Sequence, residues 1–394
     1  MKISIISSGG TLRGLYLAEQ LDRKGFLSRL YIPFYSRKHP FIEKRLITRN
    51  HEHRIDPRKV TTDIPVSMAQ KYFFGSKLSG AIKKNDKRYM IYELIDKRNA
   101  GAFKADCDIL FVESYIALHT IMAARKEGVR CVLDRTNTHV KYQSAVISEE
   151  YVKYGINMEL NSSAIIEKGI KEYELADRIA VLSNFVRKTF LDKNINEEKL
   201  LTIPSGVSAE KFKKSGKKDN IFRVVFCGRA SIKKGTHYLL EAFSGLSIPG
   251  AELWLIGGYS GEMLPFFKKY EGTFKMFGHI DHNKLGEYYS QASVFVLPSI
   301  EEGLAKVMME AMACGIPVIA TPNTGAEDVI RNGIDGFIVP AGSADALKEK
   351  IVYYYENPSE CIGMGESARM RILSGFTWEH YAERFIEGMK GVSA

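Results

Sequence analysis

The stretch FRVVFCGRASIKKGTHYLLEAFSGL, residues 222–246, carries the pattern that decides the fold. A short β-branched and aromatic run ends at a glycine, a basic turn follows, and an apolar-periodic segment then predicts a helix. Strand, turn and helix in this order are the repeating unit of a parallel α/β sheet. Ligands of such sheets bind beyond the carboxyl ends of the strands, where Arg229 and either Lys233 or Lys234 emerge as candidate phosphate ligands.

The same rhythm continues on both sides of this stretch. Strand-like runs are KISIIS, CDILFVE, RCVLDR and RIAVLS before it, and AELWLIGG, TFKMFG, VFVLPS, PVIAT and GFIVPA after it. Residues 200–220, LLTIPSGVSAEKFKKSGKKDN, are polar and rich in Lys and Gly, which indicates a linker. We therefore predict two doubly wound domains, residues 1–204 and 205–375.

Composition agrees with a globular chain of about two domains. The 394 residues are 45% hydrophobic and 26% charged. The opening MKISIISSGG is expected to be a first strand and not a signal peptide. The most apolar stretch, residues 109–124, is interrupted by Glu113 and His119, so any membrane attachment is expected to be peripheral. Five widely spaced cysteines without a CxxC pair favour a reducing cytoplasm over a disulfide framework or structural zinc.

The net charge of +10 is unevenly distributed. Residues 1–100 hold 21 Lys and Arg against 9 Asp and Glu, whereas residues 201–394 hold 21 against 22. This basic end of the chain predicts a surface attracted to anionic lipids. Its contributors are Arg37, Lys38, Lys44, Arg45, Lys83, Lys84, Lys87 and Arg88, with Phe41, Tyr72, Phe73 and Phe74 nearby. No nucleic-acid recognition motif accompanies them, so nucleic acid is not an expected partner.

A second motif is SIEEGLAKVMMEAMACGIPVIAT, residues 299–321. A helix is predicted to begin near Ala305, and its first backbone N–H groups suit a diphosphate. Glu302 precedes this helix, and Glu310 lies within it among Ala, Met and Cys, which predicts burial. A buried carboxylate needs a hydrogen-bonding partner, and a ligand hydroxyl is the partner expected for Glu310.

Together the two motifs resemble those of the family-4 retaining glycosyltransferases of the GT-B fold. The resemblance extends to SSGGTLRGLYLAEQL, YELADRIAVLSNFVRKTF, IPSGVSAEKF, MFGHIDHNKLGEYYSQASVFVLPS, TGAEDVIRNGIDGFIV and FTWEHYAERF. It implies an α/β fold of two Rossmann-like domains facing across a cleft, with residues 376–394 packing back onto the N-terminal, acceptor-side domain. The chain departs from the family pattern where Ala305 and Lys306 stand in place of a Gly and an apolar residue, and where Thr324 replaces a Gly.

The resemblance also implies a donor site in the C-terminal domain for a nucleoside-diphosphate sugar, with UDP or GDP as its nucleotide and no further cofactor or metal. The implied phosphate ligands are Arg229, Lys234, Gly10 and Lys306. The implied sugar and nucleotide contacts are Gly303, Leu304, Ala305, Glu310 and His279. Glu302 is implied to act near the transferred sugar. The basic charge of residues 1–100, with its expected attraction to anionic lipids, favours a lipid-linked or cell-envelope glycan as the acceptor.

In the N-terminal half, LDRTNTHVKYQ at residues 133–143 follows a predicted strand and contains Arg135 and His139. The family places a polar residue here that faces the sugar, so His139, and next Arg135, are the candidate catalytic groups. Gly9, Gly10 and Thr11 predict a tight turn through which backbone can approach a ligand. The turn lacks the GxGxxG spacing of a dinucleotide site.

The DxD sequence at residues 106–108 resembles a metal motif of another glycosyltransferase architecture. It precedes a predicted strand and so lies at the amino end, away from the expected site. The sequence thus predicts a metal-independent glycosyltransferase, cytoplasmic or peripheral on the cytoplasmic face of a membrane. A sugar-nucleotide epimerase of the same fold and a catalytically silent scaffold are the alternatives.

Overall fold

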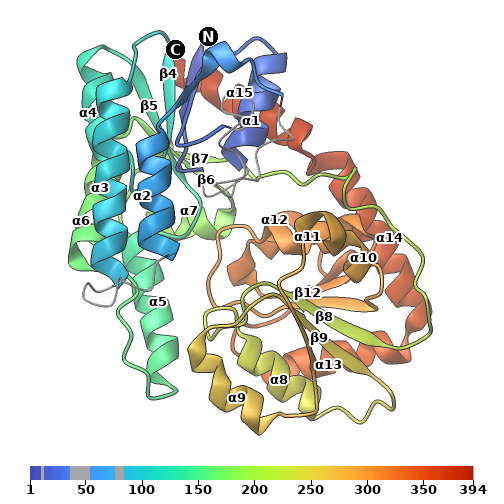
Figure 1. The fold of residues 1–394 in the computed structure, drawn as a ribbon. Coiled ribbons are helices and arrows are strands. Elements are labelled where there is room, and N and C mark those ends of the chain that lie inside the picture. Colours follow the sequence, from blue (N-terminus) through green and yellow to red (C-terminus); the bar gives the residue numbers. More distant parts are fainter. Residues whose placement is uncertain (10–12, 36–53, 76–83, 394) are drawn as a thin grey trace.

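The computed structural model describes residues 1–9, 13–35, 54–75 and 84–393, except for the side chains of residues 70–75, 84–86 and 393. Two parallel sheets organise this chain (Figure 1), each the centre of one domain. The sequence prediction of a GT-B arrangement of two Rossmann-like domains is confirmed. No helix within the described ranges is both long enough and apolar enough to cross a membrane.

The N-terminal sheet has seven strands in the order β3-β2-β1-β4-β5-β6-β7. Its strands are β1 (Ile3–Ile6), β2 (Leu27–Ile32), β3 (Val60–Thr62), β4 (Ile109–Glu113), β5 (Arg130–Arg135), β6 (Arg178–Val181) and β7 (Leu200–Thr202). Its helices are α1 (Arg13–Arg23), α2 (Ile64–Gly75), α3 (Lys84–Ala102), α4 (Leu118–Lys126), α5 (Val140–Val152), α6 (Ser163–Leu175) and α7 (Asn184–Leu191).

The C-terminal sheet has six strands in the order β10-β9-β8-β11-β12-β13. They are β8 (Arg223–Cys227), β9 (Glu252–Ile256), β10 (Lys275–Gly278), β11 (Val294–Leu297), β12 (Val318–Ala320) and β13 (Gly336–Ile338). Its helices are α8 (Thr236–Ser244), α9 (Leu264–Lys269), α10 (Leu285–Tyr289), α11 (Lys306–Ala313), α12 (Ala326–Val329), α13 (Ala344–Glu356) and α14 (Pro358–Gly375). In both domains the strand order reverses beside the first strand, which places ligand crevices between β1 and β4 and between β8 and β11.

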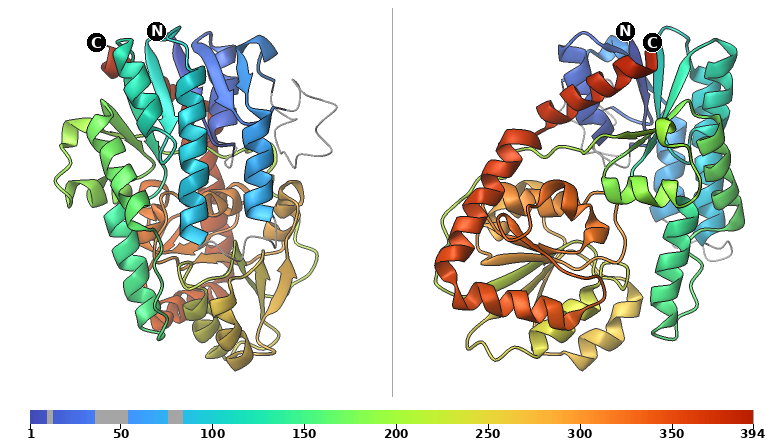
Figure 2. Two further views of the ribbon diagram at one scale, coloured as in Figure 1. Left: turned by 60° about the vertical axis from the view of Figure 1, so that its left-hand side comes forward. Right: turned by 180° about the vertical axis from the view of Figure 1, so that it is seen from behind.

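The central strands β1 and β4 are buried along almost their whole length, as expected where helices cover both faces of a parallel sheet. Alternate residues of one strand enter different cores: Phe111 joins the core under α1, whereas Leu110 and Val112 join the core under α3, α4 and α6. The helix α15 (Trp378–Ser393) closes the first of these cores, where Phe385 meets Phe111 edge to face. Figure 2 shows the chain continuing from α14 of the C-terminal domain into α15, which returns to the N-terminal domain as the resemblance implies for residues 376–394.

Every strand expected from the sequence forms, but three further strands were not foreseen. β2 and β3 extend the N-terminal sheet, and β7 adds an edge strand at the beginning of the predicted linker. The chain therefore passes from the N-terminal sheet to the C-terminal sheet between Thr202 and Arg223. A second difference concerns α5, because Ile147 and Tyr151 near its end pack into the core of the C-terminal domain.

Candidate active site

The two sequence motifs come together at the carboxyl edge of the C-terminal sheet. One loop, residues 228–235, follows β8, and the other, residues 298–305, follows the neighbouring strand β11. The backbone N–H of Ile300 donates to the carbonyl of Lys233 at 2.9 Å, which joins the loops. Gly235 has a φ of +64°, and a Cβ there would lie 1.9 Å from the carbonyl oxygen of Pro298. The loops therefore meet at the switch point where this fold binds ligands.

The basic side chains of the first loop differ in their surroundings. Arg229 is exposed, and its Nε donates to the hydroxyl of Ser260 at 3.0 Å. Lys234 is partly buried and forms an ion pair with Glu302. The candidate phosphate ligand and the candidate sugar-side carboxylate are thus direct partners in this structure. An incoming diphosphate can take over the Lys234 ammonium and release the carboxylate for other hydrogen bonds.

The start of α11 lies beside this pair. Leu304 and Ala305 are buried, and the N–H of Ala305 donates to the carbonyl of Thr324 at 3.0 Å. The ammonium of Lys306 lies 6.0 Å from the ring centroid of Trp378, at the start of α15. Gly303 touches the other domain: a Cβ there would lie 1.6 Å from the carbonyl oxygen of Thr136.

Glu310 is buried as the sequence predicts, but the chain itself satisfies its carboxylate. One oxygen accepts from Nε2 of His282 at 2.9 Å, and the other accepts from the hydroxyl of Tyr289 at 3.3 Å. No ligand hydroxyl is therefore needed to explain its burial. His279, the histidine chosen from the sequence, is exposed three residues before the one that contacts Glu310.

His139, the first candidate catalytic group, is buried after the loop that follows β5. It is the N-cap of α5, where its Nδ1 accepts from the N–H of Lys141 at 3.3 Å. Its ring packs 5.1 Å from both Tyr173 and Phe190. Burial and the nearby Arg135 charge lower the pKa of His139 to about 4, so the imidazole is neutral at physiological pH.

Arg135 is also buried, and its guanidinium braces the loop before α5. Its Nη2 and Nε donate to the carbonyl of Thr138 at 2.7 and 3.1 Å, and it lies over the ring of Tyr115. The guanidinium of Arg135 is therefore engaged in contacts within the protein. Arg135 and His139 lie at the carboxyl end of β5, and the loop between them contacts the C-terminal domain where Thr136 meets Gly303.

Glu301 is the residue that sequence reasoning missed. Its side chain is fully buried, 2.6 Å from the ammonium of Lys233, and it accepts hydrogen bonds from Thr138 and Gln143 of the N-terminal domain. Burial alone would raise the pKa of Glu301, but Lys233 and these donors lower it to about 2. The repeated pattern Lys-Lys and Glu-Glu was the available signal, because it permits two ion pairs between the loops.

In the N-terminal domain, the glycine turn after β1 is braced by a carboxylate at the end of β4. Glu113 accepts from the N–H and the hydroxyl of Ser8 at 2.8 and 2.9 Å, and Gly9 has the expected left-handed φ of +74°. Burial raises the pKa of Glu113. Gly10, the candidate phosphate ligand from this turn, lies outside the described residues, as does Thr11.

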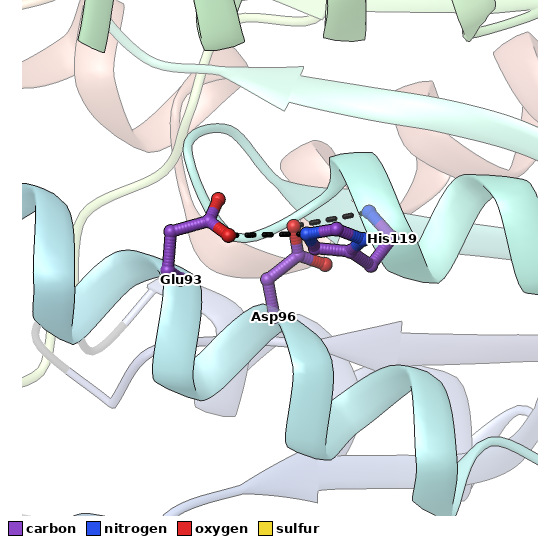
Figure 3. Close-up of side chains that lie close together, drawn as sticks. All are labelled: Glu93, Asp96 and His119. Carbon is purple, nitrogen blue, oxygen red and sulfur yellow. Dashed lines mark hydrogen bonds and ion pairs between the residues drawn. The ribbon is translucent and has the colours of Figure 1, made fainter. Parts of the chain in front are cut away.

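Two acidic groups could suggest metal sites. Asp106 and Asp108 lie at the amino end of β4, where they pair with Arg29 and with the backbone N–H of Lys2. Glu93, Asp96 and His119 gather between α3 and α4 (Figure 3) and are the one such trio among the residues that the structure describes. The ammonium of Lys168 lies 2.5 and 2.6 Å from the two carboxylates of that trio and supplies the balancing charge.

A cavity of about 530 Å³ lies at the opposite, amino-terminal edge of the C-terminal sheet. Phe222 and Pro317, which precede β8 and β12, line it together with Tyr354 and the linker residue Lys217. Its walls share no residue with the two loops described above. The charged groups suited to a diphosphate are at the carboxyl edge, so this cavity is separate from the candidate donor site.

Comparison with known proteins identifies the domain that carries both loops. Residues 207–371 match the family described as "Glycosyl transferases group 1". Residues 207–371 form a group 1 glycosyltransferase domain. The chain is 24% identical over 300 residues to an uncharacterized glycosyltransferase of Methanocaldococcus jannaschii, covering 72% of this chain and 75% of that protein. It is 28% identical over 230 residues to the capsular polysaccharide biosynthesis glycosyltransferase CapM of Staphylococcus aureus, covering 52% of this chain and 60% of CapM.

Solved glycosyltransferases share the fold over the whole chain. Sucrose-phosphate synthase of Thermosynechococcus elongatus superposes with a TM-score of 0.72 at 19% identity, covering 99% of this chain and 98% of that one. Anabaena HepE in complex with UDP gives 0.69 at 15% identity, covering 99% and 100%. These likenesses extend the GT-B arrangement from the group 1 domain to both domains.

Proposed function

We propose that this protein transfers a sugar from a nucleoside-diphosphate sugar to a cell-envelope or lipid-linked glycan, with retention of configuration. The observation that carries the proposal is the pairing of Lys234 with Glu302 between two loops at the switch point of the group 1 domain, beside the start of α11. The structure of HepE, which has the same fold, was solved in complex with UDP, and CapM acts in capsular polysaccharide biosynthesis. These names support the donor and acceptor classes.

In the proposed reaction, the bond between the anomeric carbon and the diphosphate oxygen breaks, and the electron pair stays on the diphosphate. Arg229, Lys234 and the first N–H groups of α11 then stabilise the developing charge. The acceptor hydroxyl oxygen forms the new bond to the anomeric carbon, and its proton passes to the leaving diphosphate. Glu302, released from Lys234, is free to bind hydroxyls of the transferred sugar.

The experiment is a transfer assay with purified protein, labelled UDP- and GDP-sugars, and a membrane-lipid extract as acceptor. Label should move from one of the donors to the acceptor fraction. A donor-only incubation separates the epimerase alternative, because an epimerase changes the sugar of the donor without any acceptor. Absence of transfer with every donor, while the donor alone is converted, would replace the proposal with that alternative.

We also propose that the reaction needs no metal, because Arg229, Lys234 and a helix start already supply positive charge to the diphosphate. A chelator should then leave most of the transfer activity. Complete loss in EDTA, with rescue by Mn²⁺ or Mg²⁺, would show that a metal takes part.

We propose a cytoplasmic enzyme that binds anionic membranes reversibly through its N-terminal domain. The support is the charge of residues 1–100. Of its contributors, Arg37, Lys38, Phe41, Lys44, Arg45 and Lys83 lie outside the described residues, as do the side chains of Tyr72, Phe73, Phe74 and Lys84. Lys87 is buried, and Arg88 donates to Asn161 at 2.6 Å, so both side chains are packed against the protein.

Vesicle sedimentation tests the membrane proposal. The protein should sediment with anionic vesicles at low salt, stay in solution with neutral ones, and dissociate as salt shortens the Debye length from about 10 Å at 0.1 M. Recovery in the supernatant with anionic vesicles at low salt would contradict it.

A further inference from the structure

Two consecutive ion pairs join the loops of the donor site. Lys233 pairs with Glu301, and Lys234 pairs with Glu302. The side chains of Lys234 and Glu302 are partly exposed, with 22% and 15% of their surfaces accessible. In the other pair the side chain of Lys233 is 25% accessible, but that of Glu301 is fully buried. The carboxylate of Glu302 is therefore available to a donor, whereas that of Glu301 is held by the protein.

The carboxylate of Glu301 is hydrogen-bonded to residues of the N-terminal domain. Its Oε1 accepts from the hydroxyl and the backbone N–H of Thr138, at 2.7 and 3.3 Å. Its Oε2 accepts from Nε2 of Gln143 at 3.1 Å and pairs with Lys233. Each carboxylate oxygen thus has two donors, and the N-terminal domain supplies three of the four. A buried carboxylate held in this way resists rearrangement because any lost donor leaves charge uncompensated.

The contact continues into the N-terminal domain. Arg135 donates to the carbonyl of Thr138 and also reaches Oε1 of Gln143 at 3.4 Å. The Gln143 amide is therefore oriented with its NH₂ toward Glu301. All four of these side chains are buried, so Arg135, Thr138, Gln143 and Glu301 form one network between the two carboxyl edges.

Helix α5, which contains Gln143, contacts the C-terminal domain at a second point. Glu150, seven residues after Gln143 on α5 and so on the same face, accepts from the hydroxyl of Tyr238 at 2.6 Å and from His237 at 3.3 Å. Between these polar ends, Ile147 enters the hydrophobic core of the C-terminal domain. The face of α5 that carries Gln143, Ile147 and Glu150 therefore contacts the C-terminal domain along the length of the helix.

We propose that Glu301 is a positioning residue: its contact with Thr138 and Gln143 holds the two domains closed and thereby fixes the adjacent Lys234 and Glu302 in the geometry for transfer. The proposal rests on the proposed function for its catalytic part, and on geometry alone for its conformational part. Glu301 itself touches protein groups and acts through its neighbour in the chain.

The test is Glu301→Gln, which keeps the shape but replaces an acceptor oxygen with an NH₂ group next to Lys233 and Gln143. We expect an increased radius of gyration in small-angle X-ray scattering, and a kcat about tenfold lower. The Kd for UDP or GDP should stay within about threefold of wild type, because Arg229 and Lys234 bind it from one domain.

Glu93→Gln is the matched control. It also removes the charge of a carboxylate paired with a buried lysine, Lys168, but within the N-terminal domain alone. It should lower the thermal stability while leaving the radius of gyration and kcat at their wild-type values. A general loss of stability would change the radius of gyration and kcat of both variants alike. A specific role of Glu301 in domain closure would change these quantities in Glu301→Gln only.

Thr138→Val provides a second variant that removes one donor from the opposite side of the same contact. It should change the radius of gyration in the same direction, and the double variant should go no further than Glu301→Gln alone. Wild-type dimensions and kcat in both single variants would overturn the proposal. If no variant and no wild-type protein transfers sugar, the proposed function fails, and the scattering data still decide whether Glu301 holds the domains together.

Discussion

Gly303→Ala should disable the active site by pushing the two domains apart. An added Cβ would lie 1.6 Å from the carbonyl oxygen and 2.7 Å from the carbonyl carbon of Thr136. Both atoms are backbone, so no side chain can turn away. Restoring an ordinary separation requires a shift of more than an ångström, and misplacement by about 1 Å can slow catalysis by about a hundredfold. We therefore expect kcat/KM for transfer to fall by about that factor.

The assay is steady-state kinetics on the folded variant, with circular dichroism to confirm the fold. Gly101→Ala is the matched control, since nothing lies within 4 Å of a Cβ added there and the residue is at the end of α3, far from the site. It should behave as wild type. A kcat/KM for Gly303→Ala within about threefold of wild type would refute the close approach of the domains at this point.

Three further predictions follow from the site. Arg229→Ala and Lys234→Ala should each slow transfer by about a hundredfold or more, as expected for losing a cation aimed at the leaving diphosphate; near wild-type rates for both would remove the donor-site assignment. Glu310→Ala should mainly weaken nucleotide binding, and Glu302→Ala should mainly lower kcat, which titration and initial-rate measurements separate; the reverse pattern would exchange their roles. Because the folded-state pKa of His139, about 4, lies below its unfolded value, it contributes stability above about pH 6.5 that is lost as pH falls towards 4. Chemical unfolding over this range should show a weaker pH dependence for His139→Asn, and an unchanged dependence would assign the titration to another group.

Local patterns were sufficient to predict two doubly wound domains, and the family resemblance supplied their GT-B arrangement. β8 and α11 contain continuous apolar or periodic residues bounded by turns, and α11 runs from Lys306 to Ala313 as expected. β7 was not predicted, because three residues at a sheet edge carry too little pattern to stand out from a linker. Pairing with β6 makes that segment a strand, and pairing is a tertiary effect.

The site shows the same division between local and tertiary information. Arg229 and one of the lysines after it could be chosen because a loop after a strand of this fold exposes its charges at one edge. The choice of Lys234 and Glu302 came from the family resemblance. Glu310 was correctly expected to be buried, but its partners come from residues 282 and 289, brought to it by the fold. For Glu301 the sequence offered only the Lys-Lys and Glu-Glu pattern, because its partners Thr138 and Gln143 are more than 150 residues away in sequence.

The most direct test of the donor site is a calorimetric titration of UDP and GDP into the wild-type protein and into the Arg229→Ala/Lys234→Ala double variant. The two loops at the carboxyl edge of the C-terminal sheet predict that one of these nucleotides binds the wild type and that the double variant loses at least about tenfold in affinity. Equal affinity in both proteins, or no binding of either nucleotide to the wild type, would contradict the assignment of this edge as the donor site.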